Sequence, residues 1–133
     1  WGIPLGRRFR ALKLWFVIRE FGVEGIQEKI RKHITLGHWL AGEIDEHPDF
    51  ELMAPVPLNT VCFRYIKGEE SKLDGLNEAI MNQINQSGKL FFTQTKLYGK
   101  FVLRLAFGNT NLEAYHVENA WHLIQKTAAN VEP

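Results

Sequence analysis

The chain has 133 residues and a mass of 15.4 kDa, with 45% hydrophobic residues, 23% charged residues and a formal net charge of +1. This length and composition are typical of one globular domain with its own core, and the near-neutral charge argues against electrostatic attraction to nucleic acid or to an anionic membrane. The single cysteine, Cys62, excludes an internal disulfide, and no apolar stretch approaches the ~20 residues of a membrane span.

The first expected element is a helix over residues 8–21, which follows the proline-bearing segment IPLGRR. Its apolar side chains cover several faces, as in a helix that is buried on more than one side. They are Phe9, Leu12, Leu14, Trp15, Phe16, Val17, Ile18 and Phe21. We expect Gly22 to end this helix and a second, amphipathic helix to run from Val23 to Pro48 at the latest.

Two strands are expected after Pro48. One covers residues 50–54. The other covers residues 60–65, where apolar and polar side chains alternate. Such alternation predicts a half-buried strand with Arg64 on the solvent side.

The second half of the chain predicts a helix that ends at Gly88, a hairpin and a last helix. The hairpin strands are residues 90–96 and 100–107, with the turn at residues 98–99. Residues 109–111, Asn-Thr-Asn, are expected to cap the last helix. Because strands follow one another without strict helix alternation, the order predicts an α+β fold, with a mainly antiparallel sheet of about four strands covered by helices.

The histidines are not spaced as metal ligands. His33 and His38 are five residues apart on one expected helix, and His116 and His122 are six apart on another. Ligands on one helix face are three or four residues apart, so we expect packing or solvated histidines and no metal site. Cys62 has no histidine close to it in the sequence, and we do not expect it to be a nucleophile.

An arginine cluster, Arg7, Arg8 and Arg10, lies at the start of the first helix, where the helix dipole disfavours cations. One interpretation is contact with an anion or a nucleic acid. The other is a set of structural ion pairs, which would form an interdomain clamp if the acidic partners lie outside this chain. The near-neutral net charge and the core-facing aromatic residues favour the ion pairs.

The segment WGIPLGRRFRALKLWFVIREFGVEGIQEKIRKHI resembles the start of the C-terminal region of the group II pyridoxal-phosphate-dependent decarboxylases. These include the aromatic-L-amino-acid, tyrosine, tryptophan and histidine decarboxylases. The resemblance continues through DFELMAPVPLNTVCFRY, LNEAIMNQINQSGKLFFTQTKLYGKFVLRLAF and AYHVENAW, and so covers nearly the whole chain. It implies the small C-terminal domain of a fold-type-I enzyme, a cytoplasmic homodimer that converts an L-amino acid, expected to be aromatic, to an amine and CO2.

The resemblance implies pyridoxal 5′-phosphate as the cofactor of the full-length enzyme. The family binds it through the lysine of a His-Lys motif, whereas this chain contains Lys32-His33 and no His-Lys pair. The cofactor is the electron sink for decarboxylation, so we expect the chain alone to bind no cofactor, to contain no catalytic residue and to be inactive. We expect residues 1–22 to be a connecting segment with a buried helix, residues 23–133 to be the small domain, and the whole chain to be a fragment of a longer enzyme.

The resemblance also implies three site residues. Leu5 is expected against the substrate side chain and Gly6 close to the cofactor phosphate, both at the edge of the neighbouring subunit's pocket; glycine suits such a backbone approach. Arg104 aligns with an arginine that pairs with the substrate carboxylate in related glutamate decarboxylases, and a structural ion pair is the alternative. Tyr98 stands where many members have arginine. The substrate amino acid, and the choice between decarboxylation and oxidative deamination, therefore stay open.

Two other classes of protein are alternatives. A free-standing α+β module that binds a small ligand or a regulatory partner would need a polar face on its first helix, which residues 12–18 lack. A nucleic-acid-binding module would use the arginine cluster and would lose affinity steeply with salt.

Overall fold

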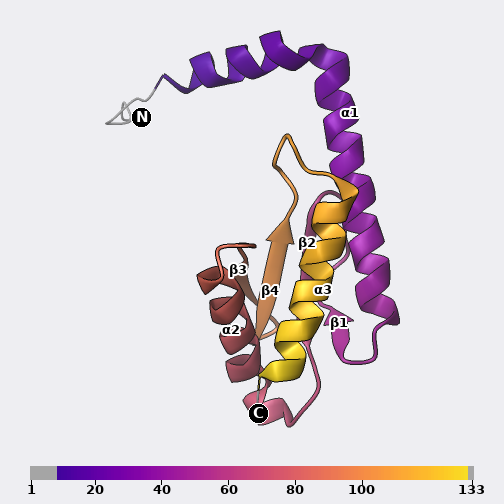
Figure 1. Ribbon diagram of the computed structural model, residues 1–133, viewed down its shortest axis with the longest axis vertical. Coiled ribbons are helices and arrows are strands. Elements are labelled where there is room, and N and C mark those ends of the chain that lie inside the picture. Colours follow the sequence, from indigo (N-terminus) through magenta and orange to yellow (C-terminus); the bar gives the residue numbers. More distant parts are fainter. Residues whose placement is uncertain (1–8, 132–133) are drawn as a thin grey trace. The chain divides into compact units, whose positions relative to one another are not determined.

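A computed structural model describes residues 9–131 of the chain (Figure 1). The elements, in chain order, are α1 (Arg10–Glu46), β1 (Phe50–Leu52), β2 (Thr60–Tyr65), α2 (Glu70–Gln86), β3 (Thr93–Leu97), β4 (Lys100–Ala106) and α3 (Ala114–Asn130). The chain divides into two compact units, of which the first ends at Lys32 and the second begins at His33. Helix α1 continues through this boundary, and each unit is described by itself below.

The second unit is built on a four-stranded antiparallel sheet with the strand order β1-β2-β4-β3. Strand β4 lies beside β2 with Phe63 opposite Leu103, and beside β3 with Thr95 opposite Val102. The predicted α+β class and the antiparallel sheet of about four strands are therefore confirmed. Strand β1 is shorter than predicted, and β3 begins three residues later than predicted.

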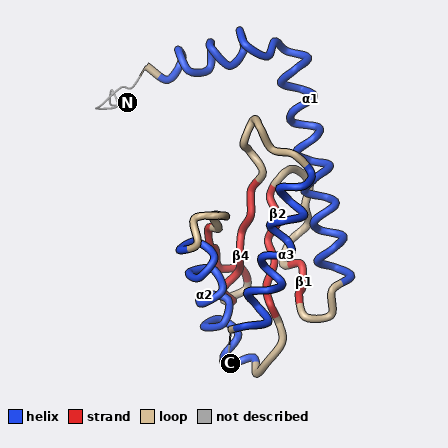
Figure 2. The backbone as a smooth tube through the Cα atoms, viewed as in Figure 1, coloured by secondary structure: helices blue, strands red, loops and turns tan. Residues whose placement is uncertain are grey.

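One hydrophobic core joins a single face of the sheet to three helices, as Figures 1 and 2 show for α2 and α3 lying together along the sheet. Alternate residues of the strands point into it, which confirms the predicted inward face of the last strand. The strands contribute Phe50, Val61, Phe63, Tyr65, Phe101, Leu103 and Leu105. The helices contribute Leu36, Leu40, Ile44, Ile80, Ile84, Val117, Trp121, Ile124 and Ala128.

Strands β2 and β4 separate at one end, and α2 supplies the missing hydrogen-bond partners. The ladder stops at Phe63, although its register would place Arg64 opposite Val102 and then Tyr65 opposite Phe101. Instead, Asn77 Oδ1 accepts from the Tyr65 N–H at 2.8 Å and Asn77 Nδ2 donates to the Tyr65 carbonyl at 2.9 Å. Asp74 Oδ1 accepts from the Phe101 N–H at 2.9 Å. Side chains of α2 thus replace backbone partners at this fork.

The prediction that Arg64 faces solvent is wrong. Its side chain is only 1% exposed, and it donates to Glu70 Oε1 at 2.8 Å and to Asp74 Oδ1 at 2.9 Å. Lys100 Nζ lies 3.3 Å from the same Glu70 oxygen. Strand alternation assumes that every second side chain meets water, but at this fork the acidic side chains of α2 pair with the guanidinium of Arg64 and it is buried.

Local turn chemistry follows the sequence with one exception. The hairpin turn has φ of 53° at Tyr98 and 80° at Gly99, as a two-residue turn between twisted strands requires. The predicted cap of the last helix at residues 109–111 is wrong. Glu113 is the N-cap residue, in a capping box with His116, whose Nδ1 accepts from the Glu113 N–H at 3.0 Å.

The first unit contains the start of α1, whose helix is interrupted at Gly22 with φ 65° and ψ 178°. A positive φ favours glycine, so the predicted helix break at this residue is confirmed. No residue between 11 and 32 is buried. The core of the second unit therefore has no counterpart in this part of the chain.

Candidate functional site

Several of the residues that the sequence singled out lie outside the described residues. Leu5 and Gly6, expected at the pocket edge, and Arg7 and Arg8 of the arginine cluster precede residue 9. Nothing is described of the Arg10 side chain either. Their expected roles therefore stay predictions.

Arg104 is exposed on β4, on the sheet face opposite the core. Its Nε donates to Thr93 Oγ1 on the neighbouring strand at 2.8 Å, and this bond fixes the direction of the guanidinium. Among the described residues it forms no ion pair with a carboxylate. Its two terminal nitrogens are thus available for bidentate binding of a carboxylate.

Cys62 lies directly opposite Arg104 in the β2–β4 ladder. Burial raises the pKa of its thiol, and the charge of Arg104 partly offsets that rise. A raised pKa keeps the thiol protonated and weakly nucleophilic near neutral pH. The side chain is a half-buried free thiol of the sheet.

Three of the histidines, His33, His38 and His116, have structural partners. His33 Nε2 lies 3.1 Å from the Asn109 carbonyl and His38 Nε2 lies 2.8 Å from the Val56 carbonyl, so both attach the end of α1 to loops of the second unit. His116 belongs to the α3 cap. Within residues 9–131 no group of histidine, cysteine and acidic side chains is arranged to hold a metal ion.

Large apolar side chains of α1, together with Phe9 just before it, are exposed, and we call them the apolar surface of α1. Phe9 is 74% exposed and Trp15 53% exposed. The remaining members are Leu12, Leu14, Phe16, Val17, Ile18, Val23 and Ile30. Exposed apolar surface of this kind marks an interaction site. Across the described residues no helix has the length and apolar character needed to cross a membrane.

The Arg64 network with Glu70, Asp74 and Lys100 was missed by the sequence reasoning. Its one signal was the pair Glu70 and Asp74, four residues apart and so on one face of a helix. Hydrogen bonds from Arg64 and Lys100 lower the pKa of the Glu70 carboxyl, with Arg64 as the larger cause. Arg64 Nε, in contrast, is buried without a hydrogen-bond partner among the described residues.

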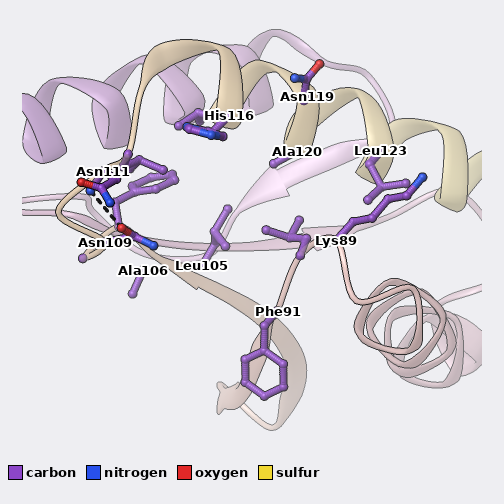
Figure 3. Close-up of a pocket in the computed structure, with 15 residues that line it drawn as sticks. Lys89, Phe91, Leu105, Ala106, Asn109, Asn111, His116, Asn119, Ala120 and Leu123 are labelled. Carbon is purple, nitrogen blue, oxygen red and sulfur yellow. Dashed lines mark hydrogen bonds between the residues drawn. The ribbon is translucent and has the colours of Figure 1, made fainter.

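A cavity of about 800 Å³ lies between β4 and α3, close to the segment before β3 (Figure 3). Leu105 and Phe107 line it from the sheet side, and Val117 and Ala120 line it from α3. All four are buried, so the floor is apolar. Lys89 is the single lysine of the lining, which contains no carboxylate. No pattern in the sequence predicted this cavity.

Comparison with known proteins gives a consistent result. The pyridoxal-dependent decarboxylase conserved domain matches residues 1–66. Aromatic-L-amino-acid decarboxylase of Sus scrofa is 46% identical over 131 residues, and the match covers 98% of this chain and 26% of the relative. Phenylacetaldehyde synthase of Arabidopsis thaliana is 44% identical over 131 residues, with 97% and 27% covered.

The solved structures agree with these sequence matches. The crystal structure of Oryza sativa TDC with PLP and tryptamine superimposes with a TM-score of 0.84 at 36% identity, covering 96% of this chain and 28% of that one. The chain therefore spans about a quarter of the length of the relatives that it matches.

Proposed function

We propose that the chain is the C-terminal part of an enzyme of the pyridoxal-dependent decarboxylase family, in the branch of the aromatic-amino-acid decarboxylases, which converts an aromatic L-amino acid to an amine and CO2. The observation that carries this proposal is the 46% identity over 131 residues. The similarity to phenylacetaldehyde synthase supports oxidative conversion to an aldehyde as the second candidate.

The family uses pyridoxal phosphate, and the described residues do not fit the whole cofactor. A site for it needs a lysine, an acidic group at the ring nitrogen and donors for the phosphate. The cavity beside α3 holds Lys89 and no carboxylate, and the exposed Arg104 has no lysine opposite it in the sheet. We therefore assign the cofactor to the part of the enzyme outside this chain and expect the chain alone to be inactive.

The proposed contribution of this chain is to the edge of the pocket. Leu5 would contact the substrate side chain, and the backbone at Gly6 would approach the cofactor phosphate, both in the neighbouring subunit's site. Arg104 would bind the substrate carboxylate. Its exposure and its bond to Thr93 support this role, because together they leave an oriented guanidinium available to a ligand.

The remaining part of the enzyme is also the proposed partner of the apolar surface of α1. Packing against the large domain, and against the second subunit of a cytoplasmic homodimer, would cover side chains that the described part of this chain leaves exposed. In this proposal residues 1–22 are the connecting segment and residues 23–133 the small domain.

A chimera tests the proposed function. Aromatic-L-amino-acid decarboxylase of Sus scrofa would carry this chain in place of its matching residues. We expect the chimera to release amine and CO2 from an aromatic L-amino acid at a rate within about tenfold of the parent, because the replaced part lies at the pocket edge. A chimera that is dimeric and retains pyridoxal phosphate, yet forms neither amine nor aldehyde, would contradict the proposal.

The role of Arg104 is tested in the same chimera with Arg104→Met. Loss of a charge-assisted hydrogen bond to the substrate predicts a drop in kcat/KM of about ten- to a hundredfold. Lys96→Met on the neighbouring strand is a matched control, because this residue is also exposed. Equal activity of the two variants would assign Arg104 a structural role.

A further inference from the structure

We propose that the cavity between β4 and α3 is a binding site for a small aromatic carboxylate, with the aromatic body on the apolar floor and the carboxylate at Lys89. This site differs from the pocket edge proposed above. It is composed of residues of the second unit only.

The cavity exists because β3 is too short to accompany β4 to its end. Strand β3 begins at Thr93, which pairs with Arg104, whereas β4 continues to Ala106 beside β2 alone. After Arg104 the edge of β4 that β3 would occupy has no neighbouring strand, and α3 lies over this open edge (Figure 3).

The size and the floor of the cavity suit a flat apolar body. Its volume of about 800 Å³ lies within the range of small-molecule sites, roughly 300–1,000 Å³. Leu105 and Phe107 lie on one side, with Val117 and Ala120 on the other, and all four are buried. An aromatic ring between them would replace water at apolar surface.

The charge of the lining selects an anionic group. Lys89 is exposed at the rim, and no carboxylate is present among the lining residues. Its ammonium forms no ion pair with any described residue. A ligand with a carboxylate would provide the missing counter-charge, whereas a ligand with an ammonium would place like charges together.

The rim also supplies neutral hydrogen-bonding groups. His116 Nδ1 accepts from the Glu113 N–H, so in the neutral ring Nε2 carries the proton and is a donor. Asn109, Asn111 and Asn119 add amide groups that accept or donate. A ring N–H such as that of indole can therefore be paired at the rim.

The test is a titration of the 15N-labelled chain with three probes that share one body: indole-3-propionate, 3-(indol-3-yl)propanol and 3-(indol-3-yl)propylamine. We expect the carboxylate to bind with a dissociation constant on the order of 1 mM, the range of ligands of this size. Shifts should concentrate in the amides of Leu105, Ala106, Val117 and Ala120. The amine should bind at least threefold more weakly than the carboxylate.

Three variants separate this site from non-specific binding. Lys89→Gln should weaken the carboxylate about three- to fivefold and leave the alcohol unchanged, as expected for an exposed ion pair. Lys126→Gln, exposed on α3 and outside the lining, is the matched control and should change nothing. Ala120→Leu should weaken all three probes by filling the floor, with its fold checked by thermal unfolding.

Equal affinity for carboxylate and amine would overturn the proposal. Shifts that lie outside the cavity, or an unchanged carboxylate affinity in Lys89→Gln, would do the same. Because Lys89 is exposed and Lys89→Gln removes only a charge, this test does not depend on a variant that disturbs the core.

Discussion

The two units of the chain differ in what covers their apolar side chains. In the second unit, Phe63 and Ile124 are fully buried among strands and helices of that unit. In the first, Phe16 is 58% exposed, and no residue from 11 to 32 is buried. Both stretches are rich in apolar residues, so composition does not distinguish them. This difference supports the proposal that the first stretch contacts polypeptide beyond this chain, which spans about a quarter of the length of its relatives.

The largest expected effect is a loss of unfolding free energy, and it should differ between two phenylalanine variants, one in each unit. Phe63→Ala removes a side chain with 0% exposure from the core and should lower the free energy of unfolding of the second unit by about 3–5 kcal/mol. Phe16→Ala should change it by less than about 0.5 kcal/mol, because Phe16 is exposed. Urea unfolding measures both. Similar losses of unfolding free energy in the two variants would contradict the difference in burial between the two units.

The next effect concerns the fork between β2 and β4. Asn77→Ala leaves the buried N–H and carbonyl of Tyr65 without partners and should cost about 2–4 kcal/mol of unfolding free energy. Asn85→Ala is the matched control on the same helix. It removes two bonds to Phe92 at a less buried position and should cost less. If Asn85→Ala lowers the unfolding free energy as much as Asn77→Ala, the burial of the Tyr65 backbone groups at the fork does not explain the loss in Asn77→Ala.

A substitution in the hairpin turn should have a smaller effect and should stabilise the fold. Tyr98 adopts a φ of 53°, which asparagine tolerates better than tyrosine, and its side chain is 90% exposed. Tyr98→Asn should therefore raise the free energy of unfolding by about 0.5–1 kcal/mol in thermal or urea unfolding. Tyr115→Asn, at an exposed helical position, should not stabilise. A destabilised Tyr98→Asn would mean that the tyrosine ring contributes contacts that outweigh the backbone preference.

The smallest effect is a pH dependence from Glu70. Its pKa in the folded chain lies below its ordinary value of 4.5, chiefly because Arg64 donates a hydrogen bond to it. The resulting stabilisation is complete above pH 4.5 and is lost as the pH falls through the lowered pKa. Glu70→Gln should therefore show a shallower fall of stability below pH 4.5 than the unmodified chain. Identical acid profiles would show that this carboxylate is not linked to folding.

Periodicity predicted most of the second unit. Each of these patterns belongs to a single element that packs against a single core, so a short window of sequence is enough to predict the element. Examples are the alternation in β4 and the helical spacing in α3, given by Phe101, Leu103 and Leu105 and by Val117 and Ile124. The break at Gly22 was predicted for a similar reason, because positive φ is a local property of glycine.

The parts that the sequence did not predict depend on two elements at once. Arg64 is buried because α2 brings Glu70 and Asp74 to the end of β2, and no window around Arg64 contains that contact. The cavity depends on where β3 begins relative to β4, which is a matter of register. Of the predicted site residues, Arg104 is placed in the sheet, and Leu5 and Gly6 precede the described residues.

Sedimentation of the isolated chain, combined with fluorescence of a hydrophobic dye, tests most directly whether the apolar surface of α1 is a contact surface. We expect self-association or strong dye binding, both reduced by Phe16→Glu, because an exposed apolar surface without its partner binds other apolar groups. Lys13→Glu on the same helix is the matched control and should leave both unchanged. A monodisperse monomer that does not raise the fluorescence of the dye would contradict a contact role for the apolar surface of α1.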